Sequence, residues 1–67
     1  MMPLKYLYEI FDKDTFVIIH IRYYDVDFTR KLSFEYIAAH EELFRMYVKK
    51  AEVFEGNLHF YLQEETQ

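Results

Sequence analysis

Cysteine is absent from the 67 residues of this chain, which also hold a single glycine and a single proline. Without cysteine, neither disulfide bonds nor cysteine-ligated metal sites can stabilise the fold. Ordering so small a domain costs roughly 100 kcal/mol at about 1.5 kcal/mol per residue, which burial of apolar surface barely offsets. The chain therefore depends on the burial of large side chains, on association with another chain, or on both.

Long apolar runs are also missing. No stretch approaches the ~20 apolar residues of a membrane helix, and residues 1–5 lead into alternating residues rather than into the apolar segment of a secretory signal. We therefore expect no membrane association and a cytoplasmic location. A glycine-rich phosphate loop is absent, and the only serine, Ser33, fits a helix cap better than a nucleophile. The sequence predicts no catalytic residues and no enzyme.

The chain is rich in aromatic and charged residues. Seven Phe and seven Tyr are present, and twelve acidic residues against eight basic ones give a formal net charge of -4. This acidic balance is typical of a solvated protein surface and argues mildly against nucleic-acid binding, which usually needs a basic domain.

Residues 15–24 are the longest β-branched and aromatic run of the chain. At the period of two residues typical of a strand, one set is apolar throughout: Val17, Ile19, Ile21 and Tyr23. The other set is mixed: Phe16, Ile18, His20, Arg22 and Tyr24. The run predicts a strand with one core face, placed inside a sheet or at an edge that a second subunit covers.

Residues 4–11 also alternate, and they predict a second strand. The polar residues 12–14 then form the turn of an antiparallel hairpin that spans residues 4–24. With the tip of the turn at residues 13–14, Ile10 faces Val17 and Tyr8 faces Ile19, so that one register brings both apolar sets together.

A long helix is expected over residues 33–51. Ser33 is a suitable N-cap, Glu35 suits the positive end of the helix dipole, and Lys49 and Lys50 suit the negative end. A broad apolar arc, with His40 near its middle, would cover one face of the sheet.

Two interpretations remain open for residues 52–63. Either the helix continues to about residue 54 and stops at Gly56, or residues 53–60 form a tight hairpin; valine, phenylalanine and the Gly-Asn pair favour the hairpin. In both cases residues 58–62 form a strand, and residues 64–67 form a frayed tail. The predicted fold is a single α+β domain over residues 1–67, with ββαβ or ββαββ order and one amphipathic helix on one sheet face.

One helix covers one face of such a sheet and leaves the other face to a partner. The predicted binding residues on that second face are Leu7, Phe11, Phe16, Ile18, His20, Arg22 and Tyr24. This mixture of aromatic and aliphatic side chains with an arginine is typical of a protein interface. Two copies of the chain could share this face or join their sheet edges, and we expect a homodimer; a different protein could instead dock there.

Histidines and aspartates offer little sign of a metal site. His20, His40 and His59 are separated by twenty and nineteen residues, which matches no compact ligand motif. His40 is expected in the core, His20 at an interface and His59 on the surface. Asp25 and Asp27 lack the further acidic ligands and the glycine of a calcium loop. The sequence predicts no metal and no cofactor.

These observations predict a small non-enzymatic interaction module, an adaptor or an inhibitor, that binds a protein through the aromatic sheet face. The alternative is a nucleic-acid-binding regulator that uses Phe16, His20, Arg22 and Tyr24 on the same face as a stacking platform for single strands.

Overall fold

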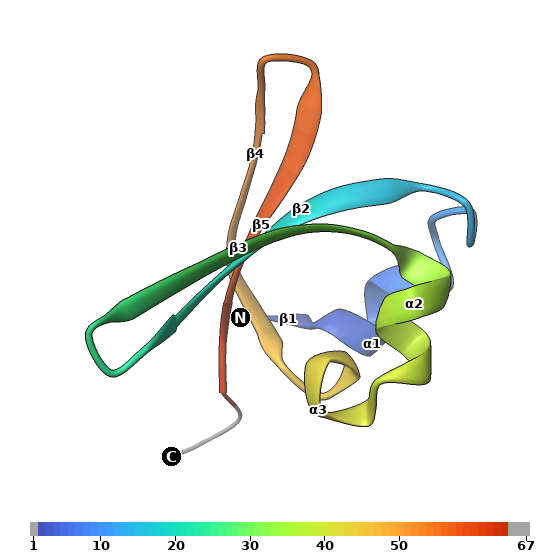
Figure 1. Ribbon diagram of the computed structural model, residues 1–67. Helices are drawn as coiled ribbons and strands as arrows, with labels where there is room; N and C mark the ends of the chain where they lie inside the picture. Colours follow the sequence, from blue (N-terminus) through green and yellow to red (C-terminus); the bar gives the residue numbers. More distant parts are fainter. Residues whose placement is uncertain (1, 65–67) are drawn as a thin grey trace.

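The computed structural model describes residues 2–64, apart from the side chain of Tyr23. Five strands form one mixed sheet, and three short helices lie on one side of it (Figure 1). In chain order the elements are β1 (Met2–Pro3), α1 (Leu4–Tyr8), β2 (Phe16–Tyr23), β3 (Val26–Ser33), α2 (Phe34–Ala39), α3 (Glu41–Phe44), β4 (Tyr47–Phe54) and β5 (Asn57–Gln63). The predicted α+β class is confirmed, whereas the number of strands and their connections differ from the prediction.

The central strand of the prediction, β2, lies inside the sheet. The strand order is β1-β4-β5-β2-β3, with β2 parallel to β5 and antiparallel to β3. The backbone N–H and C=O groups of β2 are therefore hydrogen-bonded to a neighbouring strand on both sides. An apolar strand left at an open edge would instead invite aggregation. β3 forms one edge of the sheet, and β1 covers only Tyr47 and Val48 at the opposite edge.

The core lies between the sheet and the helices. Val17 is fully buried, Ile19 is almost so and Ile21 packs against the core, which confirms the predicted core face of β2 for these three residues. The side chain of Tyr23, the fourth residue of that set, lies outside the described part of the chain. The buried cluster combines residues from the sheet and the helices: Leu4, Val17, Ile19, Phe34, Ile37, Phe60 and Leu62. Phe11 stacks on Phe34 with ring centroids 5.2 Å apart, and Phe60 packs edge-on against both rings.

The predicted strand over residues 4–11 is wrong. Residues 4–8 form helix α1, and a turn region leads from its end to β2. The reason is a second periodicity in the same residues: Leu4, Leu7, Tyr8 and Phe11 are spaced i, i+3, i+4 and i+7 and all pack against the core. Their neighbours Lys5, Tyr6, Glu9 and Ile10 are exposed. The helical pattern thus buries more apolar surface than the alternating one.

The hairpin predicted over residues 4–24 is therefore replaced by a later one. β2 pairs with β3, from Phe16 opposite Ser33 to Tyr23 opposite Val26, and residues 24–25 form the turn. Charged residues interrupt the alternation of residues 26–33, yet these residues form a full antiparallel ladder with β2, and Leu32 reaches the core.

The single helix predicted over residues 33–51 is broken at His40 and ends early. His40 has extended backbone angles, φ -114° and ψ 98°, between α2 and α3. Its ring nitrogen Nδ1 donates to the Tyr36 carbonyl at 2.8 Å, while its backbone N–H bonds to Ile37 instead. The side chain thus replaces the helical bond that would continue α2. Residues 47–54 then join the sheet as β4, where valine and aromatic residues are favoured.

The hairpin alternative for the C-terminal residues is the arrangement found. β4 and β5 pair up to Phe54 opposite Asn57, and residues 55–56 form the turn at the tip. Glu55 and Gly56 have φ angles of 53° and 79°, both in the left-handed region, which is the geometry of a type I′ hairpin turn. The strand expected over residues 58–62 lies within β5. The predicted frayed tail falls almost wholly on residues 65–67, outside the described part of the chain.

Candidate functional site

The face of the sheet opposite the helices is the candidate site, and we call it the open face. Strand register places side chains from four strands on it: Phe16, Ile18, His20 and Arg22 from β2, Asp27, Thr29 and Lys31 from β3, His59 and Tyr61 from β5, and Lys50, Glu52 and Phe54 from β4. The helices lie on the other side of the sheet (Figure 1). Aromatic, basic and acidic groups therefore share a surface that α1, α2 and α3 leave uncovered.

The structure brings together four of the seven predicted binding residues. Phe16, Ile18, His20 and Arg22 lie on the open face, and Tyr24 follows in the turn with 84% of its surface exposed. Leu7 and Phe11 do not belong to this surface. Because residues 4–8 form a helix, both side chains are half-buried and pack against the core on the opposite side of the sheet.

A hydrogen-bonded row crosses three strands of the open face. His20 Nε2 lies 2.8 Å from His59 Nδ1, and Thr29 Oγ1 lies 3.4 Å from His20 Nδ1. His59 is only 8% exposed, so the expectation that it lies on the surface is wrong. Its other nitrogen, Nε2, is buried and has no hydrogen-bond partner in the described chain. Burial of such a group is unfavourable, and the bond to His20 partly compensates for it.

A second polar group adjoins this row on β4 and β5. The Tyr61 hydroxyl donates to Glu52 Oε2 at 2.9 Å, and Lys50 Nζ lies 3.6 Å from the other oxygen of the same carboxylate. The Tyr61 ring stacks on His20 with centroids 4.3 Å apart. Lys50 also lies over the Tyr61 ring at 5.2 Å. These contacts fix the position of the phenol ring next to the histidine pair.

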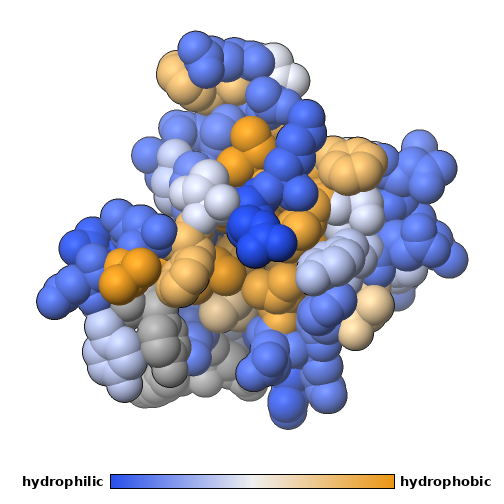
Figure 2. Space-filling model, in the orientation of Figure 1, coloured by the Kyte–Doolittle hydropathy of each residue, from blue (hydrophilic) through white to orange (hydrophobic). Residues whose placement is uncertain are grey.

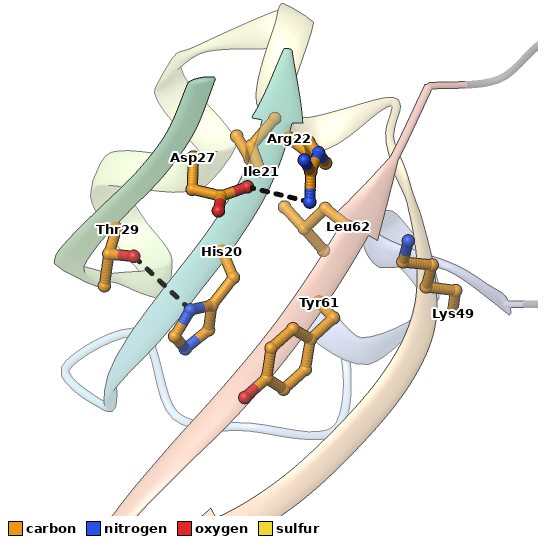
Figure 3. Close-up of a pocket in the computed structure, with 8 residues that line it drawn as sticks. All are labelled: His20, Ile21, Arg22, Asp27, Thr29, Lys49, Tyr61 and Leu62. Carbon is orange, nitrogen blue, oxygen red and sulfur yellow. Dashed lines mark hydrogen bonds and ion pairs between the residues drawn. The ribbon is translucent and has the colours of Figure 1, made fainter. Parts of the chain in front are cut away.

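A shallow pocket of about 340 Å³ opens beside His20 and Tyr61 (Figure 3). Its lining is contributed by β2, β3, β4 and β5: His20, Ile21, Arg22, Asp27, Thr29, Lys49, Tyr61 and Leu62. Arg22 Nη1 lies 3.9 Å from Asp27 Oδ1 at one end, and both side chains are about two-thirds exposed. Lys49, the unpaired residue of the β-bulge in β4, lies on the β4 side of the pocket. The pocket thus has cationic groups on two sides and an aromatic wall.

The contacts shift three pKa values in this group. Burial, and to a lesser degree the charge of His59, lowers the pKa of His20, although Glu52 and Asp27 act in the opposite direction. The hydrogen bond from Tyr61 lowers the pKa of Glu52, with a smaller contribution from Lys50. The same bond raises the pKa of Tyr61. Near neutral pH these shifts favour a neutral His20 beside an ionised Glu52 and a protonated Tyr61.

No group of three or more His, Cys, Asp or Glu side chains within residues 2–64 is placed to hold a metal ion. His20 and His59 approach one another, but the short distance between their nitrogens is that of a hydrogen bond. His40 is exposed on the helix side, stacked on Tyr36 at 4.1 Å, and not in the core as expected. Asp25 lies in a turn and Asp27 pairs with Arg22.

Sequence reasoning missed the contribution of β4 to the site. The alternation of residues 57–63 places His59 and Tyr61 on one strand face, and this signal is readable without a structure. Lys50 and Glu52 carried no such signal while residues 47–51 were assigned to a helix. Their place beside Tyr61 depends on the antiparallel pairing of β4 with β5.

Comparisons with family models, with curated proteins and with solved structures return no match for this chain. Within residues 2–64, none of the helices has the length and apolar character needed to cross a bilayer.

Proposed function

We propose that this chain is a small, non-enzymatic interaction module that binds an acidic segment of a partner protein through the open face. The observation that carries the proposal is a sheet face, uncovered by α1, α2 and α3, on which aromatic side chains are interspersed with basic ones. Cores of protein interfaces are enriched in aromatic residues and arginine in the same way.

Apolar contact area is available at one end of this face, where β2 and β5 begin and β4 ends. Phe16 is 56% exposed at the start of β2, and Phe54 is 57% exposed at the end of β4. Ile18 lies half-buried next to Phe16 in the same strand. Exposed aromatic rings on one sheet face supply the anchors that a docking partner can bury.

The charge of the open face is opposite in sign to that of the chain. The open face carries three cationic side chains, Arg22, Lys31 and Lys50, and two carboxylates, and Lys49 adds a fourth cation at the pocket, whereas the chain as a whole carries a formal charge of -4. Arg22 and Lys50 have carboxylate partners at 3.9 and 3.6 Å. Lys31 and Lys49 form no ion pair with the described residues. A partner segment with carboxylates would satisfy them and approach along a favourable field.

The histidine row supports binding rather than catalysis. Thr29 Oγ1 stands 3.4 Å from His20 Nδ1, which is long for a hydrogen bond that would activate a hydroxyl. The other nitrogen of His20 is engaged by a second imidazole and not by a carboxylate that would stabilise the protonated ring. This arrangement holds His20 in place, which supports a binding role.

A phage-displayed library of random peptides, selected on the native chain, tests the proposal. We expect selected peptides to combine Asp or Glu with apolar residues. These peptides should bind the Phe16→Asp and Arg22→Glu variants at least tenfold more weakly than the native chain. Phe16→Asp replaces an aromatic contact with a negative charge, and Arg22→Glu replaces a positive charge with a negative one that repels an acidic peptide. The control Ile10→Asp alters a residue that is 71% exposed and lies in the turn region before β2, and it should leave binding unchanged. Ligands that bind all three variants equally would contradict the proposal.

Single-stranded nucleic acid is the second candidate, since His20 and Tyr61 stack on one another between cationic groups. Binding of oligo(dT) to the native chain, measured between about 50 and 200 mM salt, separates the two. Tight binding that weakens steeply with salt would favour nucleic acid, because phosphate contacts release counterions.

A further inference from the structure

The outer edge of β3 is the largest unpaired feature of the sheet. β3 spans Val26–Ser33 and is exposed over its first six residues, and within residues 2–64 it pairs with β2 alone. In Figure 1 it runs across the front of the sheet, and Figure 2, in the same orientation, shows apolar residues gathered at the middle of the molecule with strongly hydrophilic ones among them. An exposed edge of this length invites pairing with another strand.

We infer that this edge pairs with its own copy, so that two chains form a continuous ten-stranded sheet about a two-fold axis at Thr29. In this register, Asp27 of each chain lies opposite Lys31 of the other, so the pair occurs twice, once on each side of the axis. Phe28 lies opposite Arg30 on the other face. Each charged residue thus meets an opposite charge or an aromatic ring.

The neighbouring registers are less favourable. Antiparallel strands pair residues of matching hydrogen-bonding type, so the axis falls on a residue and not between two. An axis at Arg30 would place the Arg30 side chains of the two copies opposite one another. An axis at Phe28 would leave fewer residues of β3 in the ladder between the two chains. Only the axis at Thr29 combines nearly the full length of β3 with opposite charges, and Val26 then meets Leu32 at each end.

The other edge of the sheet is less suited to such pairing. β1 occupies one end of β4, and a β-bulge between Val48 and Lys50 distorts the strand. Lys50 and Glu52 of β4 already pair within the chain. On β3, by contrast, Lys31 has no carboxylate partner among the described residues, and Asp27 forms only an exposed contact with Arg22.

The inferred dimer extends the open face. A two-fold axis perpendicular to the sheet keeps both open faces on the same side. Lys31 of the partner copy would lie beside Asp27, which lines the pocket next to His20. The pairing uses the backbone edge of β3 and engages only Asp27, Thr29 and Lys31 of the open-face side chains. Phe16, Arg22, Phe54 and the pocket beside His20 stay available, so a monomer could still bind a partner segment and a dimer could form without one.

Charge reversal tests the register. Native chain should dimerise in light scattering over a dilution series, and Asp27→Lys or Lys31→Asp should each weaken the dimer at least tenfold, because each places like charges opposite one another at two symmetric positions. Mixing the two variants should restore a dimer. Asp27→Lys raises the formal charge of -4 by two units and Lys31→Asp lowers it by two units. Both variants therefore stay net negative, so opposite net charges cannot explain a restored dimer. Asp14→Lys, in the exposed turn before β2, is the control and should dimerise like native chain.

A single introduced cysteine tests the position of the axis, since the native chain has none. Thr29→Cys should form a disulfide-linked dimer under mild oxidation, because directly opposite residues have Cα atoms about 5.5 Å apart. Lys31→Cys lies two residues from the axis, so its copy is four residues further along the ladder, beyond disulfide reach. A monomeric native chain, a dimer insensitive to both charge reversals, or faster crosslinking of Lys31→Cys would overturn the inference.

Discussion

His20 Nε2 lies 2.8 Å from His59 Nδ1, and this bond joins β2 to the parallel strand β5 on the open face. One ring must donate and the other accept, so the bond is lost when both rings are protonated. Burial and the charge of His59 lower the pKa of His20 in the folded chain. As the pH falls, the unfolded chain therefore takes up a proton before the folded chain does, and folding becomes less favourable.

We expect the lowered pKa of His20 to leave the free energy of unfolding unchanged above about pH 7 and to reduce it as the pH falls below the ordinary histidine value of 6.5. Urea unfolding between about pH 7.5 and 5.5 measures the effect. His20→Gln should flatten this part of the profile, whereas His40→Gln, on the exposed helix side, should not. Equal slopes for the native chain and His20→Gln would show that the pair is not responsible.

Phe34 provides a test of the core. It is fully buried, stacks on Phe11 and meets the edge of Phe60. Phe34→Ala should cost about 3–5 kcal/mol, which is comparable with the whole stability of a domain of this size. We expect circular dichroism to show loss of the cooperative unfolding transition.

The matched control for that change is Phe16→Ala on the open face, where more than half of the side chain is already exposed. It should cost about 1 kcal/mol or less, because little apolar surface returns to water. A similar loss for both variants would mean that Phe16 belongs to the folding core and not to a binding surface.

The period of two residues in β2 was sufficient to predict which of its residues face the core. Val17 and Ile19 are buried, and Phe16, Ile18, His20 and Arg22 share the open face. The same rule failed for residues 4–11, because Leu4 and Tyr8 satisfy the helical and the strand period alike. Neither intrinsic propensity nor the local pattern distinguishes a helix from a strand here. The helix is favoured because it packs Leu4, Leu7, Tyr8 and Phe11 into the buried cluster that contains Phe34.

The neighbours of each strand in the sheet are harder to predict from the sequence than the strands themselves. β2 lies between β3 and β5, and the pairing with β5 joins residues about forty positions apart. The turn before β3 contains Tyr24 at φ 58° and no glycine, so the usual sequence signal for a hairpin is missing there. His59 and Glu52 entered the site through these long-range pairings, which no local pattern of residues encodes.

Ser33 was expected to cap a helix, and its Oγ accepts a hydrogen bond from the backbone N–H of Tyr36 at 3.1 Å. α2 has six residues, so this cap satisfies a large share of its free N–H groups. Ser33→Ala should lower the free energy of unfolding by about 1 kcal/mol in urea titrations. Ser33→Asp retains an acceptor and should stay near the native value; equal losses for both would indicate that the cap contributes little.

The turn between β4 and β5 holds a strained residue next to its glycine. Glu55 has φ 53°, a left-handed conformation that is unfavourable for most side chains but well tolerated by asparagine. Glu55→Asn should therefore raise the free energy of unfolding by about 0.5–1 kcal/mol, since Asn-Gly is the preferred pair for a type I′ turn. Glu55→Val should lower it, because a β-branched side chain suits this conformation least.

Thermal and urea unfolding of the two variants measure these changes. Glu64→Asn is the matched control: it removes the same negative charge from an exposed residue outside regular structure and should leave stability unchanged. The expected order is then Glu55→Asn above native chain and Glu64→Asn, with Glu55→Val lowest. If Glu64→Asn stabilises as much as Glu55→Asn, relief of charge repulsion in this acidic chain explains the gain and the backbone of the turn does not.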